Sequence, residues 1–593
     1  MSKKFRKLRV LWCGEASFLK TGYAIYAKEV LDRLYKSGKY KIAELGCYAS
    51  HENPEMHSVP WRFYPNMPIG DEESQQYAAN ASYQFGEWRF DDVCLDFRPD
   101  VVIDIRDWWM TEYQQRAAFR RFYKWAIMPT VDSSPQQPQY INTYMDADAV
   151  FTYSEYGKKV LEDASNGSIS ILGIPSPGAD FDILKPVSNK SQHRAQFGFS
   201  ENITVLGTVM RNQRRKLYPN LIRSFRSMLD NNKDLMGSSF LYIHTSYPDL
   251  GWEIPYFIKK FNMGNHVLMT YKCRNCMNFF PSFYQGSRCV CTRCNSNSAT
   301  LPNTSFGLTT EEMSSVINWF DLYVQYSVCE GFGMPQVEAA ACGVPILTVN
   351  YSAMESVGKK LKAEFVEPLS FFWDSPTHSE RAIPDDKQLE EKMAEFIRLP
   401  KSIKSKKGMD AYMGVKKNYT WEKAASIWEN YLDSVEPLTH EETWDSKPRI
   451  HKESEHIPEG LNNQEFVSWA MENIAGQKQN SQSYIAQRLL RDLNSGATLN
   501  SGGSLHYNEN SYLESQNQMS QFSIEQAIDK MKNMCEYNNA WEHKRTEISN
   551  IVSSDKNEEV ITDSYSALAR WDAWRPEFLK VVKPDENNTN AAD

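Results

Sequence analysis

Apolar runs alternate along the first part of the chain with segments of helical periodicity. Residues 8–14 (LRVLWCG) form an apolar run typical of a buried strand, and segment 24–38 spaces its apolar residues as one face of a helix does. The same alternation recurs at 41–48, 99–107, 123–132 and 149–164. Strands that alternate with helices predict a parallel, doubly wound α/β sheet.

A second block repeats this pattern after a turn-rich interruption at 174–186. An apolar run at 201–210 is followed by a helical segment at 219–231. Further strand-like runs lie at 238–246, 265–271, 321–327 and 344–350, and the last helical segment is 419–435. The sequence therefore predicts two α/β lobes, 1–185 and 186–435, with a ligand-binding cleft between them at the carboxyl ends of the strands.

The composition changes after the second lobe. Residues 436–463 are polar, and 477–520 are rich in Asn, Ser, Gln and Gly with few apolar side chains to anchor them. Helical patterns return at 523–552 and 566–582. We expect a C-terminal extension, 436–593, that is mostly helical or partly disordered.

Composition and charge narrow the class of protein. A chain of 593 residues is longer than one hydrophobic core usually organises, and its net charge of −9 argues against binding a polyanion through bulk charge. No apolar run is long enough to cross a bilayer. The basic N-terminus leads into an apolar run too short for a signal peptide, so we expect a cytoplasmic protein without a transmembrane segment.

Segment 321–350 carries the most informative chemistry. It predicts a buried strand, a glycine-containing loop (Glu330–Gly333), a short helix with Pro335 in its first turn, and another strand. Such a loop presents free backbone N–H groups at a helix N-terminus, which is a favourable site for a phosphate group. Glu338 lies in the first part of this helix, placed to accept hydrogen bonds from ligand hydroxyls.

Glu330 and Glu338, separated by seven residues in EGFGMPQVEAAACGVP, resemble the E-x7-E motif of the family-4 (group-1) retaining glycosyltransferases. The resemblance implies the GT-B fold, in which two Rossmann-like lobes face a cleft. It implies that Glu330 lies near the donor sugar and that Glu338 holds the ribose hydroxyls of a UDP- or GDP-sugar. The amides of Gly331, Phe332 and Gly333 would then donate to the diphosphate.

Residues 207–225 (GTVMRNQRRKLYPNLIRSF) resemble another segment of the same family. In that segment an Arg and a Lys neutralise the donor pyrophosphate as it departs, which implies this role for Arg211 and Lys216. Arg214 and Arg215 lie close to them in the sequence and are further cations for the same task.

Three other segments resemble the family. Residues 14–30 resemble its first loop, which places Gly22 where donor sugar and acceptor meet. Residues 174–186 resemble its interlobe turn, and 419–432 resemble its closing helix. The resemblance therefore extends over both predicted lobes.

Asp132 follows an apolar run at a position where this family often carries a His. A carboxylate there can orient the acceptor or act as a general base, although an Asp in such a turn commonly caps it. Asp104 and Asp107, beside Trp108 and Trp109 at another strand end, are further candidates for the cleft.

The resemblance implies an enzyme that moves a sugar from a nucleoside diphosphate sugar to an acceptor hydroxyl, with retention of configuration and without a divalent ion in the cleft. Its catalytic candidates are Glu330, Asp132, Arg211 and Lys216. The acceptor is a saccharide, lipid or protein in the first interpretation, and a nucleic acid such as a hydroxymethylated DNA base in the alternative. A second alternative is a non-catalytic GT-B-like binding or scaffold protein, and the presence of these charged residues argues against it.

The cysteines predict a metal site. Of 11 cysteines, four lie in two C-x2-C pairs separated by 14 residues, Cys273 with Cys276 and Cys291 with Cys294. Two such pairs can hold one zinc ion in a closed tetrahedral site, which is structural because no coordination position is left for a substrate. Cys289 is a spare that could replace Cys291. We therefore expect a zinc-ribbon insertion at 271–302, the cysteine ribbon.

Two interpretations of the cysteine ribbon stay open. It is rich in cations, with aromatic residues between them: Lys272, Arg274, Arg288 and Arg293, with Phe279, Phe280, Phe283 and Tyr284. Cations interleaved with aromatic rings suit nucleic-acid binding through phosphate neutralisation and base stacking. In the other interpretation the ribbon stabilises the fold, its rings cover the metal site, and the net negative charge of the protein favours this interpretation.

Overall fold

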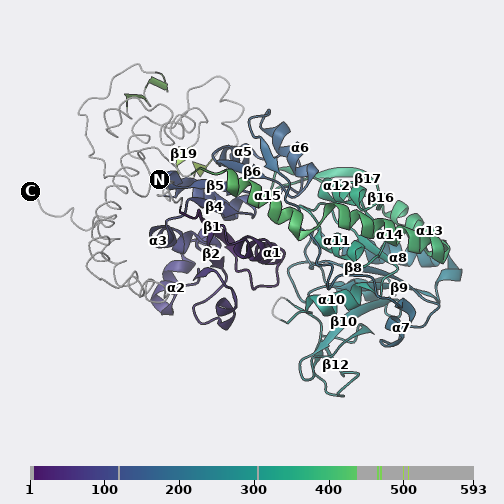
Figure 1. Ribbon diagram of the computed structural model, residues 1–593. Helices are drawn as coiled ribbons and strands as arrows, with labels where there is room; N and C mark the ends of the chain where they lie inside the picture. The colour runs from purple at the N-terminus through teal and green to yellow at the C-terminus, as the bar shows by residue number, and fades with distance from the viewer. Residues whose placement is uncertain are drawn as a thin grey trace, which may run out of the picture.

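The computed structural model describes residues 6–117, 120–303 and 306–436, together with a few short pieces between 462 and 506 (Figure 1). Two of these pieces, β19 (Thr498–Leu499) and β20 (Leu505–His506), pair antiparallel. Most of the predicted C-terminal extension, 436–593, lies outside the described residues. Its mixture of helix and disorder therefore stays a prediction.

The first lobe is built on a parallel sheet. Its strands are β1 (Arg9–Glu15), β2 (Lys41–Cys47), β3 (Arg62–Pro65), β4 (Val101–Asp104), β5 (Lys124–Ile127), β6 (Ala149–Phe151) and β7 (Ile171–Gly173). Its α-helices are α1 (Gly22–Lys36), α2 (Gly70–Ala78), α3 (Glu87–Phe97), α4 (Trp108–Thr111), α5 (Pro138–Met145) and α6 (Glu155–Ala164). Short 3₁₀ helices occupy η1 (Pro54–Ser58), η2 (Ala81–Phe85), η3 (Glu112–Arg116) and η4 (Arg120–Phe122). The sheet order is β3-β2-β1-β4-β5-β6-β7.

The second lobe repeats this plan with an antiparallel addition. Its strands are β8 (Thr204–Val209), β9 (Ser239–His244), β10 (Val267–Cys273), β11 (Phe279–Phe283), β12 (Arg288–Cys289), β13 (Ala299–Thr300), β14 (Leu322–Gln325), β15 (Ile346–Val349), β16 (Glu364–Val366), β17 (Pro368–Asp374) and β18 (Ser379–Pro384). Its helices are α7 (Lys190–Ala195), α8 (Tyr218–Asn231), η5 (Lys233–Leu235), α9 (Ile254–Lys260), α10 (Thr310–Ile317), α11 (Met334–Ala341), α12 (Ser352–Lys360), α13 (Asp386–Arg398) and α14 (Lys401–Asn418). The parallel order is β10-β9-β8-β14-β15-β16, and the cysteine ribbon adds β11, β12 and β13 antiparallel beside β10.

The strand order reverses at one point in each sheet. The reversal lies between β1 and β4 in the first lobe and between β8 and β14 in the second. Loops that leave neighbouring strands at such a point turn to opposite faces of the sheet and open a crevice between them. The loop after β1 leads to Gly22, the loop after β8 leads to Lys216, and the loop after β14 begins near Glu330. The fold therefore puts three of the predicted site residues at the two crevices.

The helices cover these sheets with their apolar faces. In α1, Ala27, Val30, Leu31 and Leu34 are buried at helical spacing, while Thr21 caps the helix by accepting a hydrogen bond from the amide of Ala24. The inner strands are buried on both faces, as parallel strands between helices are. Among the described helices, none is both long enough and apolar enough to cross a bilayer.

The chain returns to the first lobe in its last described helix, α15 (Trp421–Ser434), which packs against α1 (Figure 1). The indole of Trp428 is fully buried, and its N–H donates to the hydroxyl of Tyr26 at 2.8 Å. Where the chain crosses between lobes, the amide of Ala179 donates to the carbonyl of Tyr419 at 3.1 Å. A Cβ at Gly178 would overlap the backbone of Trp421, so glycine is needed where these two crossing segments meet.

Replacing Trp428 with alanine should destabilise the protein by about 3–5 kcal/mol, because it leaves a large cavity between α15 and α1 and a hydroxyl without its partner. Denaturant or thermal unfolding measures this loss. Tyr256→Ala, at a ring that is 56% exposed in α9, is the matched control and should have almost no effect. Equal stability of both variants would contradict the role assigned to α15.

Candidate functional site

The loop between β14 and α11 has the backbone geometry of an anion site. Gly333 has a φ of 83°, in the left-handed region that favours glycine, and Pro335 lies in the first turn of the helix. Within the described part of the chain, the amides of Gly331, Phe332 and Gly333 donate to no protein acceptor. These N–H groups stand at the positive end of a helix and are available to a phosphate oxygen.

Glu330 is the buried carboxylate at the start of this loop. Only 4% of the residue is exposed. Gln325 donates to its Oε1 at 2.7 Å, and the ammonium group of Lys216, also buried, contacts the same oxygen. The amide of Glu330 donates to Ser352 Oγ at 2.9 Å, which fixes the backbone. A buried charge is tolerated when it is paired and hydrogen-bonded in this way.

Glu338 has a different environment. Its residue is half-buried one helical turn into α11, and burial raises the pKa of its carboxyl to about 7. No hydrogen bond or ion pair to this carboxylate is found among the described residues. A carboxylate without a protein partner beside free amides is well placed to accept hydrogen bonds from hydroxyl groups of a bound ligand.

The cations of the β8 loop divide between two places. Arg211 is exposed and forms a two-pronged ion pair with Asp249, at 2.9 and 3.2 Å. Lys216 lies against Glu330, and Arg215 reaches to 3.9 Å from Glu330 Oε2. The structure thus brings Lys216 to the predicted site and turns Arg211 towards the loop after β9. The assignment of Arg211 to the donor pyrophosphate stays a prediction.

The first lobe closes over the glycine loop. A Cβ at Gly331 would overlap the side chain of Thr130, and one at Gly22 would lie 3.8 Å from the sulfur of Met334. The buried Glu44 fixes the loop that leads to Gly22. Its carboxylate accepts hydrogen bonds from the amide of Ser17 at 2.7 Å and from the hydroxyl of Ser17 at 2.8 Å. Small residues therefore let the two lobes meet directly at the site.

Asp132 bridges the lobes. Its Oδ1 lies 2.7 Å from Arg381 Nη1, and its Oδ2 accepts from the thiol of Cys329, the neighbour of Glu330, at 3.3 Å. Although burial opposes ionisation, the guanidinium of Arg381 holds the pKa of Asp132 below its ordinary value. Asp132 is thus a stable carboxylate at the mouth of the site.

The two further aspartates, Asp104 and Asp107, lie in different environments. Asp104 is fully buried and paired with Arg106 at 2.5 Å, so it supports the sheet. Asp107 faces the cleft, where burial, and secondarily the charge of Asp132, raises the pKa of its carboxyl to about 6. The hydroxyls of Tyr23 and Thr130 lie beside it and bond each other at 2.7 Å.

Two functional side chains have a weak signal in the sequence. Arg381 belongs to the hairpin β17–β18, and its partner Asp132 is 249 residues away in the chain numbering, so no local motif connects them. The hairpin itself leaves little pattern, because neither FFWD nor SERAIP alternates apolar with polar residues. Arg215 is visible in the sequence as one of several cations, and only the fold distinguishes it from Arg214.

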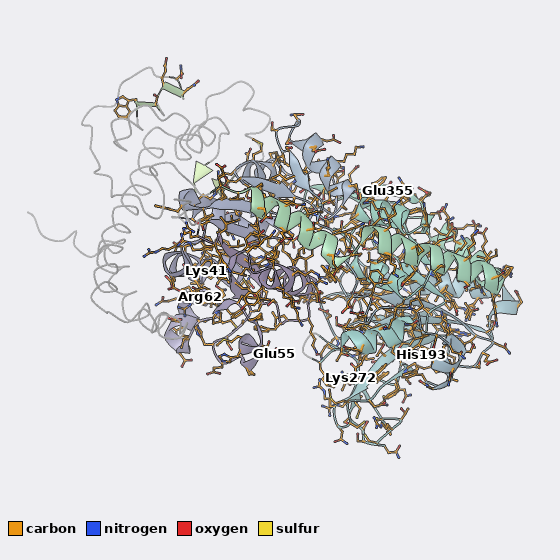
Figure 2. The ribbon with its side chains drawn as sticks, viewed as in Figure 1. Lys41, Glu55, Arg62, His193, Lys272 and Glu355 are labelled. Atoms are coloured by element: carbon orange, nitrogen blue, oxygen red, sulfur yellow. The ribbon has the colours of Figure 1, made fainter. Side chains whose placement is uncertain are left out.

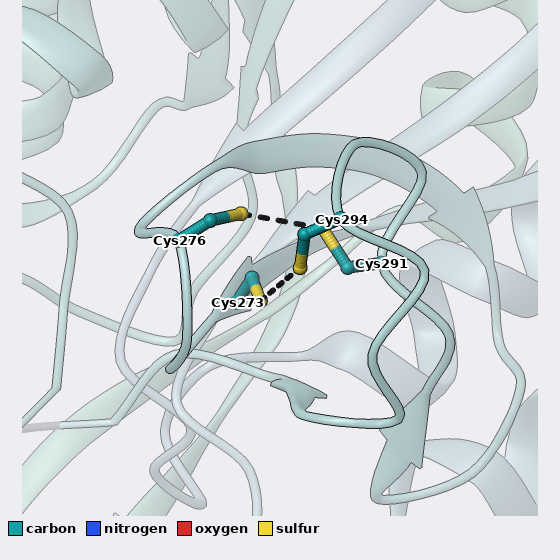
Figure 3. Close-up of side chains that lie close together, drawn as sticks. All are labelled: Cys273, Cys276, Cys291 and Cys294. Carbon is teal, nitrogen blue, oxygen red and sulfur yellow. Dashed lines mark hydrogen bonds between the residues drawn. The ribbon is translucent and has the colours of Figure 1, made fainter.

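The four predicted cysteines meet (Figure 3). The sulfurs of Cys273, Cys276, Cys291 and Cys294 all lie within 4.8 Å of one another. The pairs Cys273–Cys294 and Cys276–Cys291 are each 3.6 Å apart. This separation is far beyond a disulfide bond of about 2.05 Å. It is close to the roughly 3.8 Å between sulfurs that each bind a central zinc ion at about 2.3 Å. Cys289 is buried outside this cluster.

The two halves of the cluster repeat each other. The amide of Asn275 donates to Cys273 Sγ at 3.4 Å, and the amide of Arg293 donates to Cys291 Sγ at 3.4 Å. The residue after each pair, Met277 or Asn295, adopts a left-handed backbone with φ of 60° or 54°. Two equivalent loops that aim amides at sulfur stabilise thiolates, so the residues fit a bound metal ion.

The side chains of the cysteine ribbon are largely committed to packing. Lys272, labelled in Figure 2, is buried and paired with Glu312 at 2.7 Å. Phe279 packs against Trp319, with ring centroids 6.0 Å apart. Arg274 stacks on Phe306 at 4.3 Å. Arg274 is nevertheless exposed, as are Met277, Phe283, Arg288, Val290 and Arg293.

Comparison with known proteins supports this description. Residues 293–400 match the family "Glycosyl transferases group 1". The match includes the glycine loop, Glu330 and Glu338. It covers a minority of the chain. A search of curated protein sequences found no significant match.

Solved structures share the fold at low sequence identity. Sucrose-phosphate synthase from Thermosynechococcus elongatus superposes with a TM-score of 0.53 at 14% identity, covering 72% of this chain and 100% of that chain. The N-terminal domain of trehalose-6-phosphate phosphatase from Candida albicans gives 0.51 at 12% identity, covering 73% and 99%. An Escherichia coli structure described as trehalose-6-phosphate bound with UDP-2-fluoro glucose gives 0.50 at 10% identity, covering 73% and 100%. The predicted fold class, two Rossmann-like lobes in the GT-B arrangement, is confirmed.

If the cysteine cluster holds zinc, the purified protein should contain about one zinc ion per chain by elemental analysis. Cys276→Ser should lose the metal and lower the melting temperature, because three thiolates bind it less tightly. Cys289→Ser is the matched control and should retain it, since that thiol lies outside the cluster. A metal-free protein, or equal loss in both variants, would contradict the assignment.

Proposed function

We propose that this protein is a retaining glycosyltransferase that uses a nucleoside diphosphate sugar. The observation that carries the proposal is the glycine loop, whose free amides lie between the Lys216–Glu330 pair and the unpartnered Glu338. The match of this segment to glycosyl transferases group 1 supports it. The GT-B fold provides a cleft between two lobes, but the fold alone does not identify a substrate.

Each part of a donor finds complementary groups. The diphosphate is bound by the amides of residues 331–333 and by Lys216, with Arg211 able to join if it leaves Asp249. Glu338 accepts the ribose hydroxyls. Glu330 faces the donor sugar once Lys216 turns to the diphosphate. The neighbour bound with UDP-2-fluoro glucose supports a UDP-sugar, and a GDP-sugar fits the same groups.

The transfer needs no covalent intermediate with the protein. The bond between the sugar C1 and the diphosphate oxygen breaks, and a new bond forms from C1 to the acceptor oxygen on the same face. The acceptor proton passes to the departing diphosphate oxygen, whose negative charge Lys216 and the loop amides stabilise. This arrangement requires no divalent ion, since Lys216 and the loop amides compensate the negative charge of the departing diphosphate.

Asp132 and Asp107 serve the acceptor side. The ion pair with Arg381 and the lowered pKa make Asp132 a weak base, so we assign it to orienting an acceptor hydroxyl. Asp107, with its pKa of about 6, is ionised near neutral pH and can accept a hydrogen bond from the acceptor hydroxyl, while the proton itself passes to the departing diphosphate. The charge of Arg215 lowers the pKa of both carboxylates, so both lie near the transfer centre.

The cysteine ribbon is proposed to hold zinc and to stabilise the second lobe. Its buried Lys272 and packed Phe279 favour this role over nucleic-acid binding, which needs free cations and free rings. A saccharide, lipid or protein acceptor therefore remains the first choice. The Lys216–Glu330 pair beside the free loop amides also argues against a non-catalytic scaffold.

Removing the carboxylate of Glu338 should weaken binding of UDP or GDP by about tenfold to a hundredfold, the loss expected for hydrogen bonds to a charged group. Isothermal titration calorimetry on Glu338→Ala measures it. Glu395→Gln, at an exposed position in α13, is the control for charge removal and should bind as the wild type does. Unchanged affinity in Glu338→Ala would refute the ribose assignment.

The pKa of Glu338 also predicts a pH dependence. Hydroxyl donors favour the ionised carboxylate, so nucleotide affinity should rise as pH increases through about 7 and fall as the carboxyl becomes protonated below it. Glu338→Gln should remove this component while leaving any titration of the nucleotide itself. Parallel pH profiles for wild type and Glu338→Gln would show that another group is responsible.

A further inference from the structure

A hairpin of the second lobe reaches across to the first lobe beside the candidate site. It consists of β17 and β18, and its second strand touches the loop after β5. Ser379 Oγ lies 2.8 Å from Ser133 Oγ, and the amide of Glu380 donates to the carbonyl of Ser134 at 2.9 Å. Together with the Arg381–Asp132 ion pair, these bonds hold the hairpin against both lobes.

A pocket of about 380 Å³ lies between this hairpin and the β8 loop. Its lining residues come from the β8 loop and α8, from Trp252 and Val328, and from the hairpin: Arg214, Arg215, Leu217, Asn220, Trp252, Val328, Phe372, Asp374 and Arg381–Pro384. It shares Arg215 with the Glu330 site and Arg381 with Asp132. A ligand in this pocket is therefore next to the transfer centre.

The charge of the pocket is positive and only partly compensated. Arg381 is neutralised by Asp132 at 2.7 Å and by Asp374 at 3.7 Å. Arg214 is exposed and has no ion pair with any described residue. Arg215 is exposed too. Its ion-pair partner, Glu330 Oε2, is 3.9 Å away, and Lys216 already contacts the other oxygen of that carboxylate. Two neighbouring guanidinium groups are thus available to an anion.

The rest of the pocket lining is largely apolar. Phe372 and Trp252 contribute rings, and Val328 and Ile383 contribute aliphatic surface. Trp252 lies against the β8 loop, where its indole N–H donates to the carbonyl of Lys216 at 2.6 Å. Alternation along β17 places Phe372 towards the pocket, whereas the next residue, Trp373, points to the other face and is 63% exposed. Rings beside cations suit a ligand that carries both an apolar ring face and a negative group.

We infer that this pocket binds the acceptor, and that the acceptor is a saccharide carrying a phosphate or carboxylate group. The inference rests on the proposed function. The anionic group pairs with Arg214 and Arg215, the sugar ring lies on Phe372 and Trp252, and a hydroxyl extends towards Asp132. The hairpin then determines acceptor specificity, because it supplies the apolar wall and, through Arg381, positions Asp132.

The test uses the full-length protein and three probes: glucose 6-phosphate, glucuronic acid and glucose. Binding is measured by calorimetry, with UDP present to fill the donor site. The phosphate and the carboxylate probe should bind, with the stronger of the two identifying the anionic group, and glucose should bind at least tenfold more weakly. The inference would be overturned if glucose bound as tightly as glucose 6-phosphate and glucuronic acid do, or if neither anionic sugar bound.

Variants locate the binding. Arg214→Ala and Phe372→Ala should each weaken anionic-sugar binding by about tenfold or more, the effect of losing a charge-assisted bond or a ring contact. The controls are Arg226→Ala, at an arginine paired with Asp230 on α8, and Trp373→Ala on the far face of β17. Equal effects in variants and controls, or inorganic phosphate binding as tightly as glucose 6-phosphate, would overturn the assignment.

UDP affinity and slow donor hydrolysis in water distinguish failure of the acceptor pocket from failure of the proposed function. Both should be unchanged in Phe372→Ala, because Phe372 does not belong to the donor site. Normal UDP binding with no effect of Phe372→Ala or Arg214→Ala on sugar binding defeats the acceptor pocket alone. Absence of UDP binding in the wild type defeats the proposed function instead.

Discussion

The candidate site depends on a buried ion pair at the carboxyl end of the second lobe's sheet. Glu330 and Lys216 come from the loops on either side of the strand-order reversal in the second lobe, and both are buried. Such a pair is costly to desolvate and is kept only where hydrogen bonds complete it, as Gln325 does here. It stores a cation and a carboxylate beside the free amides of residues 331–333. In the proposed function, the donor diphosphate recruits this cation without a large rearrangement.

Local chemistry explains why much of the site is visible in the sequence. The glycine loop, Pro335 and Glu338 lie within one strand–turn–helix unit, and the four clustered cysteines lie within one insertion, so spacing alone predicts their geometry. Strands β1, β2, β4, β5 and β6 are likewise predicted by apolar runs. Strands β3 and β7 are missed, because β3 (RFYP) begins with Arg and ends at Pro, and β7 (ILG) runs directly into the turn-rich segment 174–186.

Pairing between distant residues is what the sequence leaves open. Asp132 gains its partner Arg381 only where the two lobes meet, and Asp107 gains its neighbours Tyr23 and Thr130 only through the folding of the first lobe. Arg211 shows the converse, since the family resemblance implies a place at the phosphate whereas the fold pairs it with Asp249. The cysteine ribbon extends the sheet at β10 and covers what would otherwise be an open edge strand. Its packed aromatic residues are a consequence of that position.

The central claim is that this cleft cleaves a nucleotide sugar with retention. The most direct measurement is proton NMR of the hexose released when the protein hydrolyses UDP-α-glucose or GDP-α-mannose without an acceptor. The account predicts that the first sugar to appear is the α anomer, before mutarotation mixes the two forms, and that Lys216→Ala abolishes its release. Initial release of the β anomer would contradict retention, and no release from any nucleotide sugar would contradict the enzyme itself.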